Sequence, residues 1–261
     1  MALRLGTTLI GLPLILASVI LGSPLLVIMI GVLAVGALWE FYRFFSGRLD
    51  LTLFILSSLW LLAIIFNGQF DGVYTLPIVS SGLFATLVMV LARGYRTNLT
   101  PIFMASIVGP LYVGLPLSYA LLIRSLDNGA EWLLIALLTT FAVDSGAFFV
   151  GRIFGRHNLA PTISPGKTWE GSLGGVLAGV GACYVLAQLL DLPLFRWEAV
   201  GIGLIVGVIS QIGDLVESFI KRAVGAKQSG NLLPGHGGVL DRLDSIVFVL
   251  VVLYYFAIWV D

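Results

Sequence analysis

Residues 210–245 read SQIGDLVESFIKRAVGAKQSGNLLPGHGGVLDRLDS, a polar stretch between two long apolar runs. It contains four carboxylates, four basic side chains and one of the two histidines of the chain. If its first part is helical, polar side chains at i, i+3, i+4 and i+7 share one face of the helix: Asp214, Glu217, Ser218 and Lys221. The stretch therefore predicts a helix with a polar stripe inside an otherwise apolar fold.

The second part of the stretch repeats this spacing after a glycine-rich connector. Asp241 and Asp244 stand at i and i+3. The connector 230–238 ends in Gly-His-Gly-Gly, a run in which backbone N–H groups can come close to an anionic ligand. The pattern predicts two carboxylate-bearing helix ends that face a phosphate.

The composition of the chain indicates an integral membrane protein. Of 261 residues, 59% are hydrophobic and only 11% are charged, and the mean hydropathy of +1.05 lies far above the range of soluble domains. The formal net charge is zero, which argues against nucleic acid as a partner. The single cysteine, Cys183, excludes a disulfide framework within the chain and a cysteine metal cluster.

A transmembrane helix needs about 20 apolar residues, and we find about nine such segments. The predicted fold is therefore an all-α polytopic bundle. No small-residue cleavage site follows the first segment, so we expect a retained helix and not a processed leader. The predicted spans are 5–22, 24–45, 51–67, 72–92, 101–123, 131–152, 171–190, 198–220 and 239–260.

The basic residues fit nine spans, because alternate loops then differ sharply in positive charge. Eleven of the 14 Lys and Arg residues fall on one side, Arg124 and Arg196 fall on the other, and Arg242 lies near a membrane boundary. The N-terminus is expected in the cytoplasm and the C-terminus outside. Residues 1–126 would form a scaffold that gives access to lipid. Residues 127–261 would form the catalytic half, with cytoplasmic loops 153–170 and 221–238.

The first half offers little chemistry. Glu40 lies at the cytoplasmic end of the second span, and we expect it to form an i, i+3 surface pair with Arg43. Pro110 and Pro116 are expected to kink the fifth span.

The second half places a carboxylate inside a span, followed by a polar loop. Asp144 would cost about 2.5–3.5 kcal/mol if it faced lipid, so we expect it to face a protein cavity. The segment 164–171, SPGKTWEG, contains Gly-Lys-Thr but is not a P-loop, because Pro161 occupies the position of the first glycine.

Glycines recur at four-residue spacing in the seventh and eighth spans, which favours close helix packing. This spacing does not distinguish packing within one subunit from packing between two. The glycines are Gly171, Gly175, Gly179, Gly203 and Gly207.

Five carboxylates stand at the membrane in the last four spans, and we expect them to share a polar cavity. Crowded acids repel unless cations join them, and such hard oxygen ligands suit Mg²⁺ when phosphates complete its coordination. The alternative is that the metal candidates, Asp214 and Asp241, form structural ion pairs with neighbouring Lys and Arg. The five are Asp144, Asp214, Glu217, Asp241 and Asp244.

The stretch 210–245 resembles the signature of the phosphatidate cytidylyltransferase (CDP-diacylglycerol synthase) family, and SPGKTWEG resembles the second motif of that family. Gln228 departs from the pattern, because the family usually has Asp there, and no role is assigned at that position. The residues that match the signature are Ser218, Lys221, Arg222, Lys227, Pro234, Gly235, His236, Gly237, Gly238, Asp241, Arg242 and Asp244.

The resemblance implies transfer of CMP from CTP to phosphatidate at the cytoplasmic side of the inner membrane, by a homodimer. It implies dependence on Mg²⁺, with a monovalent cation such as K⁺ as a second candidate ion. Asp214 and Asp241 would bind metal. The implied catalytic residues are Asp144, Lys167, Glu170, Lys221, Arg222, Arg242 and Asp244. The implied substrate-binding residues are Ser164, Thr168, Ser218, His236, Gly237 and Gly238.

Two rival functions stay open at this point. A relative that uses CTP on another lipid, such as a polyprenol kinase or an archaeal-lipid cytidylyltransferase, is disfavoured by the complete signature. A cation-coupled transporter would also bury acids in its spans. Acids gathered toward one face, loops suited to polyphosphate and the lack of an internal repeat argue against transport.

Overall fold

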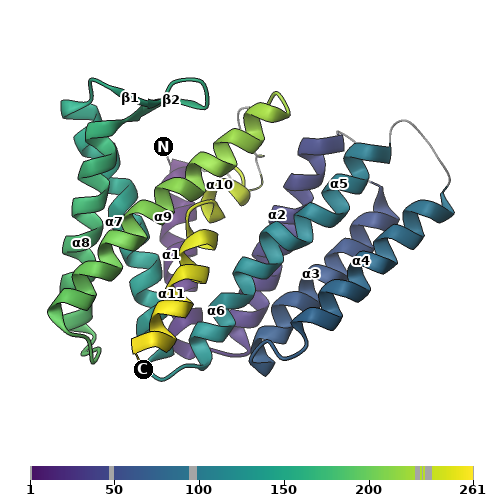
Figure 1. The fold of residues 1–261 in the computed structure, drawn as a ribbon, viewed down its shortest axis with the longest axis horizontal. Coiled ribbons are helices and arrows are strands. Elements are labelled where there is room, and N and C mark those ends of the chain that lie inside the picture. The colour runs from purple at the N-terminus through teal and green to yellow at the C-terminus, as the bar shows by residue number, and fades with distance from the viewer. Residues whose placement is uncertain are drawn as a thin grey trace. The chain divides into compact units, whose positions relative to one another are not determined.

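The computed structural model describes residues 2–46, 50–93, 99–226, 230, 232 and 237–260, and most of them are helical (Figure 1). Within these residues, eight helices are long and apolar enough to cross a membrane, so the chain is a multi-pass membrane protein. The first predicted span lies in a ninth helical segment, whose described apolar part is Gly11–Leu21. The prediction of an all-α bundle with about nine spans is confirmed.

The chain forms two compact units, and the boundary between them falls inside the short helix α10 (Leu240–Leu243). The first unit comprises Met1–Ser125 and Gln228–Asp241, and the second comprises Leu126–Lys227 and Arg242–Asp261. The remaining helices of the first unit are α1 (Ala2–Leu21), α2 (Leu25–Ser46), α3 (Leu51–Asn67), η1 (Gly68–Phe70), α4 (Thr75–Ala92), α5 (Leu99–Gly109), η2 (Pro110–Gly114) and α6 (Leu115–Ser125). The elements of the second are α7 (Gly129–Phe154), β1 (Asn158–Ala160), β2 (Ser164–Thr168), α8 (Trp169–Leu189), α9 (Arg196–Ala223) and α11 (Ile246–Val260).

Helix α2 supplies much of the core of the first unit, where it packs against α3 and α5. Its fully buried Tyr42 hydroxyl lies 2.8 Å from Ser57 Oγ on α3 and 2.7 Å from Ser106 Oγ on α5. These bonds satisfy a polar group that would otherwise be costly inside a membrane helix bundle. The expected irregularity at Pro110 takes the form of the π-helical turn η2.

Arg124 stabilises the end of α1, which explains one of the two positive charges on the predicted outer side. Its Nε donates to the Val19 carbonyl at 3.2 Å, one of the carbonyls that the end of a helix leaves without a helical partner. Gly22, at φ +73°, lets the chain turn under the guanidinium, since a Cβ there would lie 3.0 Å from Arg124 Nη2.

Asp50 caps the start of α3. Its Oδ1 accepts from the Leu53 N–H at 3.1 Å, and its Oδ2 pairs with Arg93 at the end of α4. Burial raises the pKa of Asp50, but the Leu53 N–H and the Arg93 guanidinium together lower it by more, so this pKa lies below its ordinary value.

The glycine ridge of α8 packs within the second unit. A Cβ at Gly175 would lie 2.9 Å from the Val143 carbonyl on α7, and a Cβ at Gly203 on α9 would lie 2.6 Å from Val180 Cα on α8. Helix α8 therefore approaches both α7 and α9 so closely that a side chain at these glycines would meet the backbone of the neighbouring helix. These glycines pack within one chain.

The loop predicted at 153–170 contains a small β-hairpin. Strands β1 and β2 pair antiparallel, with Asn158 opposite Thr168 and Ala160 opposite Ser164. The Trp169 N–H continues the pairing by donating to the His157 carbonyl at 2.9 Å. The hairpin gives the backbone groups of a short connection partners within the segment itself, and it holds SPGKT as a strand that leads into α8.

Candidate functional site

The central contact of the candidate site is an ion pair that joins the two predicted motifs. Lys167 on β2 places Nζ 2.7 Å from Oδ2 of Asp214 on α9. Both side chains are partly buried, which strengthens their attraction relative to a fully exposed pair. The other oxygen of Asp214, Oδ1, lies 3.4 Å from the Ser218 hydroxyl one turn later on α9. The prediction that the Asp214 stripe lies on one helical face is confirmed.

Two further contacts hold α9 against the segment around SPGKTWEG. Arg222 Nε donates to the Ile163 carbonyl in the hairpin turn at 3.1 Å. Gln211 Nε2 donates to the Ser172 carbonyl in the first turn of α8 at 3.1 Å. Because these contacts lie at 211, 214 and 222 along α9, the hairpin together with the start of α8 is held along about three turns of that helix.

Further predicted residues of the second unit gather around this pair. Asp144 on α7 has an accessible side chain and lies within electrostatic range of Asp214, Lys167 and Arg242. Asp244 lies within range of Asp214, Asp144 and Lys221, and its Oδ1 accepts from the Ser245 N–H at 2.7 Å. A Cβ at Gly213 would lie 2.5 Å from the Asp244 carbonyl, so α9 approaches the Asp244 backbone directly. The structure thus brings three carboxylates and three basic groups of the second unit into one cluster.

Glu217 has a different environment from the other acids of the stripe. Its side chain is only 1% exposed, and Oε2 lies 2.5 Å from Lys221 Nζ at i+4. Glu217 therefore forms a buried structural ion pair within α9. It holds Lys221 at the edge of the cluster.

Three predicted residues of the SPGKTWEG segment organise the backbone around it. Thr168 caps α8, because its Oγ1 accepts from the Gly171 N–H at 3.1 Å. Glu170 accepts from the Arg156 N–H at 3.1 Å and lies 2.6 Å from His157 Nδ1, so it holds the start of the hairpin. Ser164 begins β2 and is partly buried.

Asp241, Gly237 and Gly238 form a tight turn in the first unit. Asp241 Oδ2 accepts from the Gly238 N–H at 3.0 Å. Gly237 has φ +84°, and a Cβ there would lie 2.9 Å from the same carboxylate oxygen. Glycine is needed at this position both for the positive φ and for the space. The predictions for Lys227, Gln228, Pro234, Gly235 and His236 fall outside the described residues.

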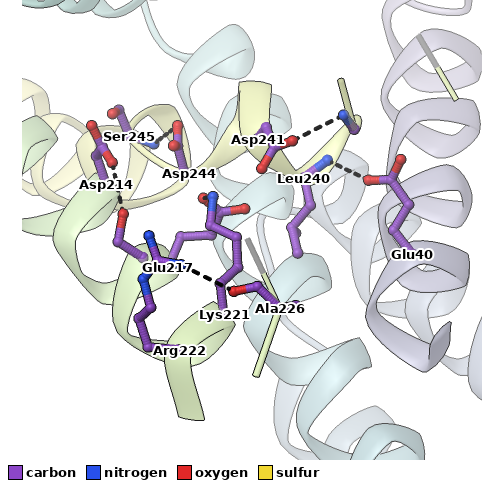
Figure 2. A network of polar contacts seen from close by, with 12 residues as sticks. Glu40, Asp214, Glu217, Lys221, Arg222, Ala226, Leu240, Asp241, Asp244 and Ser245 are labelled. Atoms are coloured by element: carbon purple, nitrogen blue, oxygen red, sulfur yellow. Dashed lines mark hydrogen bonds and ion pairs between the residues drawn. The ribbon is translucent and has the colours of Figure 1, made fainter. Parts of the chain in front are cut away.

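The expectation for Glu40 was wrong. The side chain is 0% exposed, and its Oε2 accepts from the Leu240 N–H at 2.9 Å (Figure 2). The expected partner, Arg43, is exposed and stacks over the Trp39 ring at 4.8 Å. The prediction relied on the i, i+3 spacing of Glu40 and Arg43. The free-energy cost of a carboxylate in an apolar span instead indicated a buried hydrogen-bond partner.

The carboxylates of the cluster, which include one predicted metal ligand, Asp214, provide suitable donors without forming a complete set. In the part of the chain that the structure describes, no group of three His, Cys, Asp or Glu side chains is arranged to hold a metal ion. The carboxylate oxygens of Asp144, Asp214 and Asp244 are nevertheless the donor type that Mg²⁺ prefers, and their mutual repulsion favours a cation. The donor chemistry therefore fits a metal whose remaining ligands come from a substrate.

A cavity of about 390 Å³ lies at the other end of α8 and α9, at the turn that joins them. Tyr184, Gln188, Asp191 and Arg196 line it together with apolar neighbours. None of the predicted site residues is among them.

Comparison with known proteins identifies the family of the chain. The model of the cytidylyltransferase family matches residues 2–260. A phosphatidate cytidylyltransferase of Staphylococcus epidermidis is 35% identical over 256 residues, and one of Staphylococcus aureus is 34% identical over 256 residues; each match covers 97% of both chains. One of Bacillus subtilis is 42% identical over 146 residues, which are 56% of this chain and 54% of the relative. Since the family match spans nearly the whole chain, the chain belongs to the cytidylyltransferase family.

Proposed function

We propose that the chain is a phosphatidate cytidylyltransferase, which converts CTP and phosphatidate to CDP-diacylglycerol and pyrophosphate. The relatives that match 97% of its length carry this name. The observation that carries the proposal is the Lys167–Asp214 contact, because it joins a basic glycine-rich segment to a carboxylate cluster. A nucleotidyltransferase needs this combination of anion-binding and cation-binding groups.

The chemistry requires little acid–base assistance from the protein. The phosphate of phosphatidate is largely ionised at neutral pH, since its second pKa is about 6. One of its oxygens forms a bond to the α-phosphorus of CTP, and the bond from that phosphorus to the pyrophosphate oxygen breaks. The electron pair of the broken bond leaves with pyrophosphate. The protein must chiefly bring two anions together and stabilise the charge on the leaving group.

The basic groups of the cluster suit this task. Lys167 would exchange its contact with Asp214 for a phosphate of CTP, while Lys221, Arg222 and Arg242 would hold the remaining phosphate oxygens. Asp144 and Asp244 would keep the basic groups oriented. Ser164, Thr168, Glu170 and Ser218 would shape the nucleotide side of the site. Gly237 and Gly238, together with His236, would shape the loop beside a phosphate of the nucleotide.

We include Mg²⁺ in the proposal, with Asp214 and Asp241 as its ligands and K⁺ as a candidate second ion. Bound Mg²⁺ would neutralise negative charge on the phosphates of CTP. Support comes from the carboxylate oxygens of Asp214 and Asp241, which are the hard donors that suit this ion.

The proposed setting is the inner membrane of a bacterium, with the active site toward the cytoplasm. The distribution of Lys and Arg supports this orientation. Residues 1–126 would serve as the scaffold with access to lipid, and residues 127–261 as the catalytic half with loops 153–170 and 221–238. A homodimer is also proposed. Because the glycines of α8 and α9 pack against helices of the same chain, the dimer interface would have to lie on another surface.

Pyrophosphate release tests the proposal. Purified protein in mixed micelles is given CTP, Mg²⁺ and phosphatidate, and ATP and diacylglycerol replace CTP and phosphatidate in separate controls. We expect release only when CTP and phosphatidate are both present. Cation flux through proteoliposomes without turnover of CTP would instead support a transporter.

A further inference from the structure

We infer that Glu40 is a positioning residue for the Asp241 turn, an inference that rests on the proposed function. The fully buried Glu40 lies on α2 near the start of the chain, yet its carboxylate accepts the N–H of Leu240, 200 positions later. Leu240 directly precedes Asp241, a proposed metal ligand. The hydrogen bond therefore fixes the backbone at the residue before this ligand (Figure 2).

The geometry of the turn shows how this bond acts on Asp241. Glu40 holds the Leu240 N–H at 2.9 Å. Before Leu240 in the chain, Asp241 Oδ2 accepts a hydrogen bond from the Gly238 N–H at 3.0 Å. The preceding residue, Gly237, has φ +84°. The two carboxylates thus secure consecutive parts of one turn, so a shift of Leu240 would change where the Asp241 side chain points.

The steric environment ties the same segment to α2. A Cβ at Gly230 would lie 2.6 Å from Glu40 Oε1. A Cβ at Gly36, one turn before Glu40, would lie 3.5 Å from Val239 Cγ2 and 3.8 Å from Leu232 Cδ1. Val239 and Leu240 are only 5% and 2% exposed. Helix α2 therefore packs closely against the end of the glycine-rich connector.

A buried acidic side chain at this position destabilises the fold more than an apolar one would, so packing alone does not explain Glu40. An apolar side chain would be far less costly in a membrane-spanning helix. The Glu40 side chain gives the buried Leu240 N–H an acceptor that an apolar side chain would lack, and an unpaired buried N–H would be costly. This property suits a group that must hold a catalytic turn in one conformation.

The test compares Glu40→Gln and Glu40→Ala with Glu198→Gln. Glu198 is a matched control, because it is also buried and its Oε2 accepts the Phe195 N–H at 2.8 Å, but it lies at the opposite end of α9 from Asp214. We expect Glu40→Ala to lower kcat at least tenfold. Glu40→Gln, which keeps one acceptor oxygen, should restore part of this loss. Glu198→Gln should leave kcat and the KM for CTP near wild type, whatever its effect on Tm.

Hydrogen exchange of the peptide that contains residues 237–243 provides a second readout, which needs no activity. Glu40→Ala should raise the exchange of this peptide by about tenfold or more, Glu40→Gln should raise it less because it keeps one acceptor oxygen, and Glu198→Gln should leave it unchanged. If wild type makes no CDP-diacylglycerol but the exchange pattern holds, the proposed function fails and the positioning contact stands. The inference is overturned if both Glu40 variants keep the kcat and the hydrogen exchange of wild type. It is also overturned if the Glu40 variants lose no more kcat, for a given loss of Tm, than Glu198→Gln does. Should Glu40→Ala fail to fold, Glu40→Gln decides by the same criteria.

Discussion

Lys167 and Asp214 carry opposite charges 2.7 Å apart at partly buried positions, so each lowers the cost of holding the other away from bulk water. A bound triphosphate would give Lys167 a second anion, and a bound cation would give Asp214 a second positive partner. When substrate binds, Lys167 can therefore move from Asp214 to the triphosphate while Asp214 binds the cation, and neither charge is left without a partner.

Removal of the charge at either proposed metal ligand should abolish turnover. We expect Asp214→Asn and Asp241→Asn each to lose more than nine-tenths of the wild-type rate, a barrier increase above about 1.4 kcal/mol. Both variants should stay folded in detergent, because Asn keeps the size of the side chain, although Asp214→Asn should lower the Tm somewhat through loss of the Lys167 ion pair. Asp127→Asn, an exposed loop substitution, serves as the control. A rate above one-tenth of wild type would remove that residue from the proposed ligand set.

Single residues also show what the sequence could and could not predict. The spacing of Asp214, Ser218 and Lys221 follows from helical geometry alone, and the structure confirms their shared face. The partner of Glu40 could not be deduced in this way, because a contact between positions 40 and 240 leaves no local pattern. Only the energetic cost of a lone buried carboxylate pointed to it.

At the scale of helices, close glycine packing holds α8 and α9 together and so fixes Lys167 near Asp214. Gly203→Ala should destabilise the protein, since its Cβ would meet Val180 Cα at 2.6 Å and the Gly179 carbonyl at 2.9 Å. Overpacking of this kind costs about 1–3 kcal/mol, so Tm in detergent should fall by several degrees. Gly201→Ala is the matched control on the same helix, because its Cβ would meet no atom within 4 Å. Equal Tm values for the two variants would refute the packing account.

The cap of α3 should make part of the stability of the first unit depend on pH. The pKa of Asp50 is lowered in the folded chain, so its contribution is present above the unfolded pKa of about 3.9 and is lost as pH falls through the folded value. Asp50→Asn keeps a capping oxygen but loses the charge that Arg93 pairs with. Wild type should therefore have the higher Tm at pH 7, and the difference should shrink as the pH falls below about 3.9. A difference that is independent of pH would contradict this assignment.

The β-hairpin marks the limit of prediction for elements. Long apolar runs determine the helices, because only a helix satisfies its own backbone in a bilayer. The segment 158–168 is short and polar, and its strands of three and five residues lack the apolar alternation that predicts a strand. Its structure follows from pairing between its own ends, which composition does not reveal.

At the scale of the whole molecule, the charge distribution predicts which loops share a side of the membrane. The buried Cys183 allows a labelling test in a Cys183→Ala background with one new cysteine at a time. A membrane-impermeant maleimide should label Asp127→Cys in intact cells, and it should label Gly166→Cys only after the membrane is opened. Both positions are exposed in the structure, so access to the side chain is not limiting. Labelling of Gly166→Cys in intact cells would reverse the proposed orientation.

The central claim is that this chain moves the α-phosphoryl group of CTP, with its cytidine, onto phosphatidate. The most direct test supplies CTP labelled at either the α- or the γ-phosphorus, with Mg²⁺ and phosphatidate in mixed micelles, and then separates lipid from water-soluble products. We predict that the α-label enters the lipid and that the γ-label leaves as pyrophosphate. Transfer of the γ-label to lipid would identify a kinase instead, and no transfer of either label by folded protein would contradict the assignment of this site to nucleotidyl transfer.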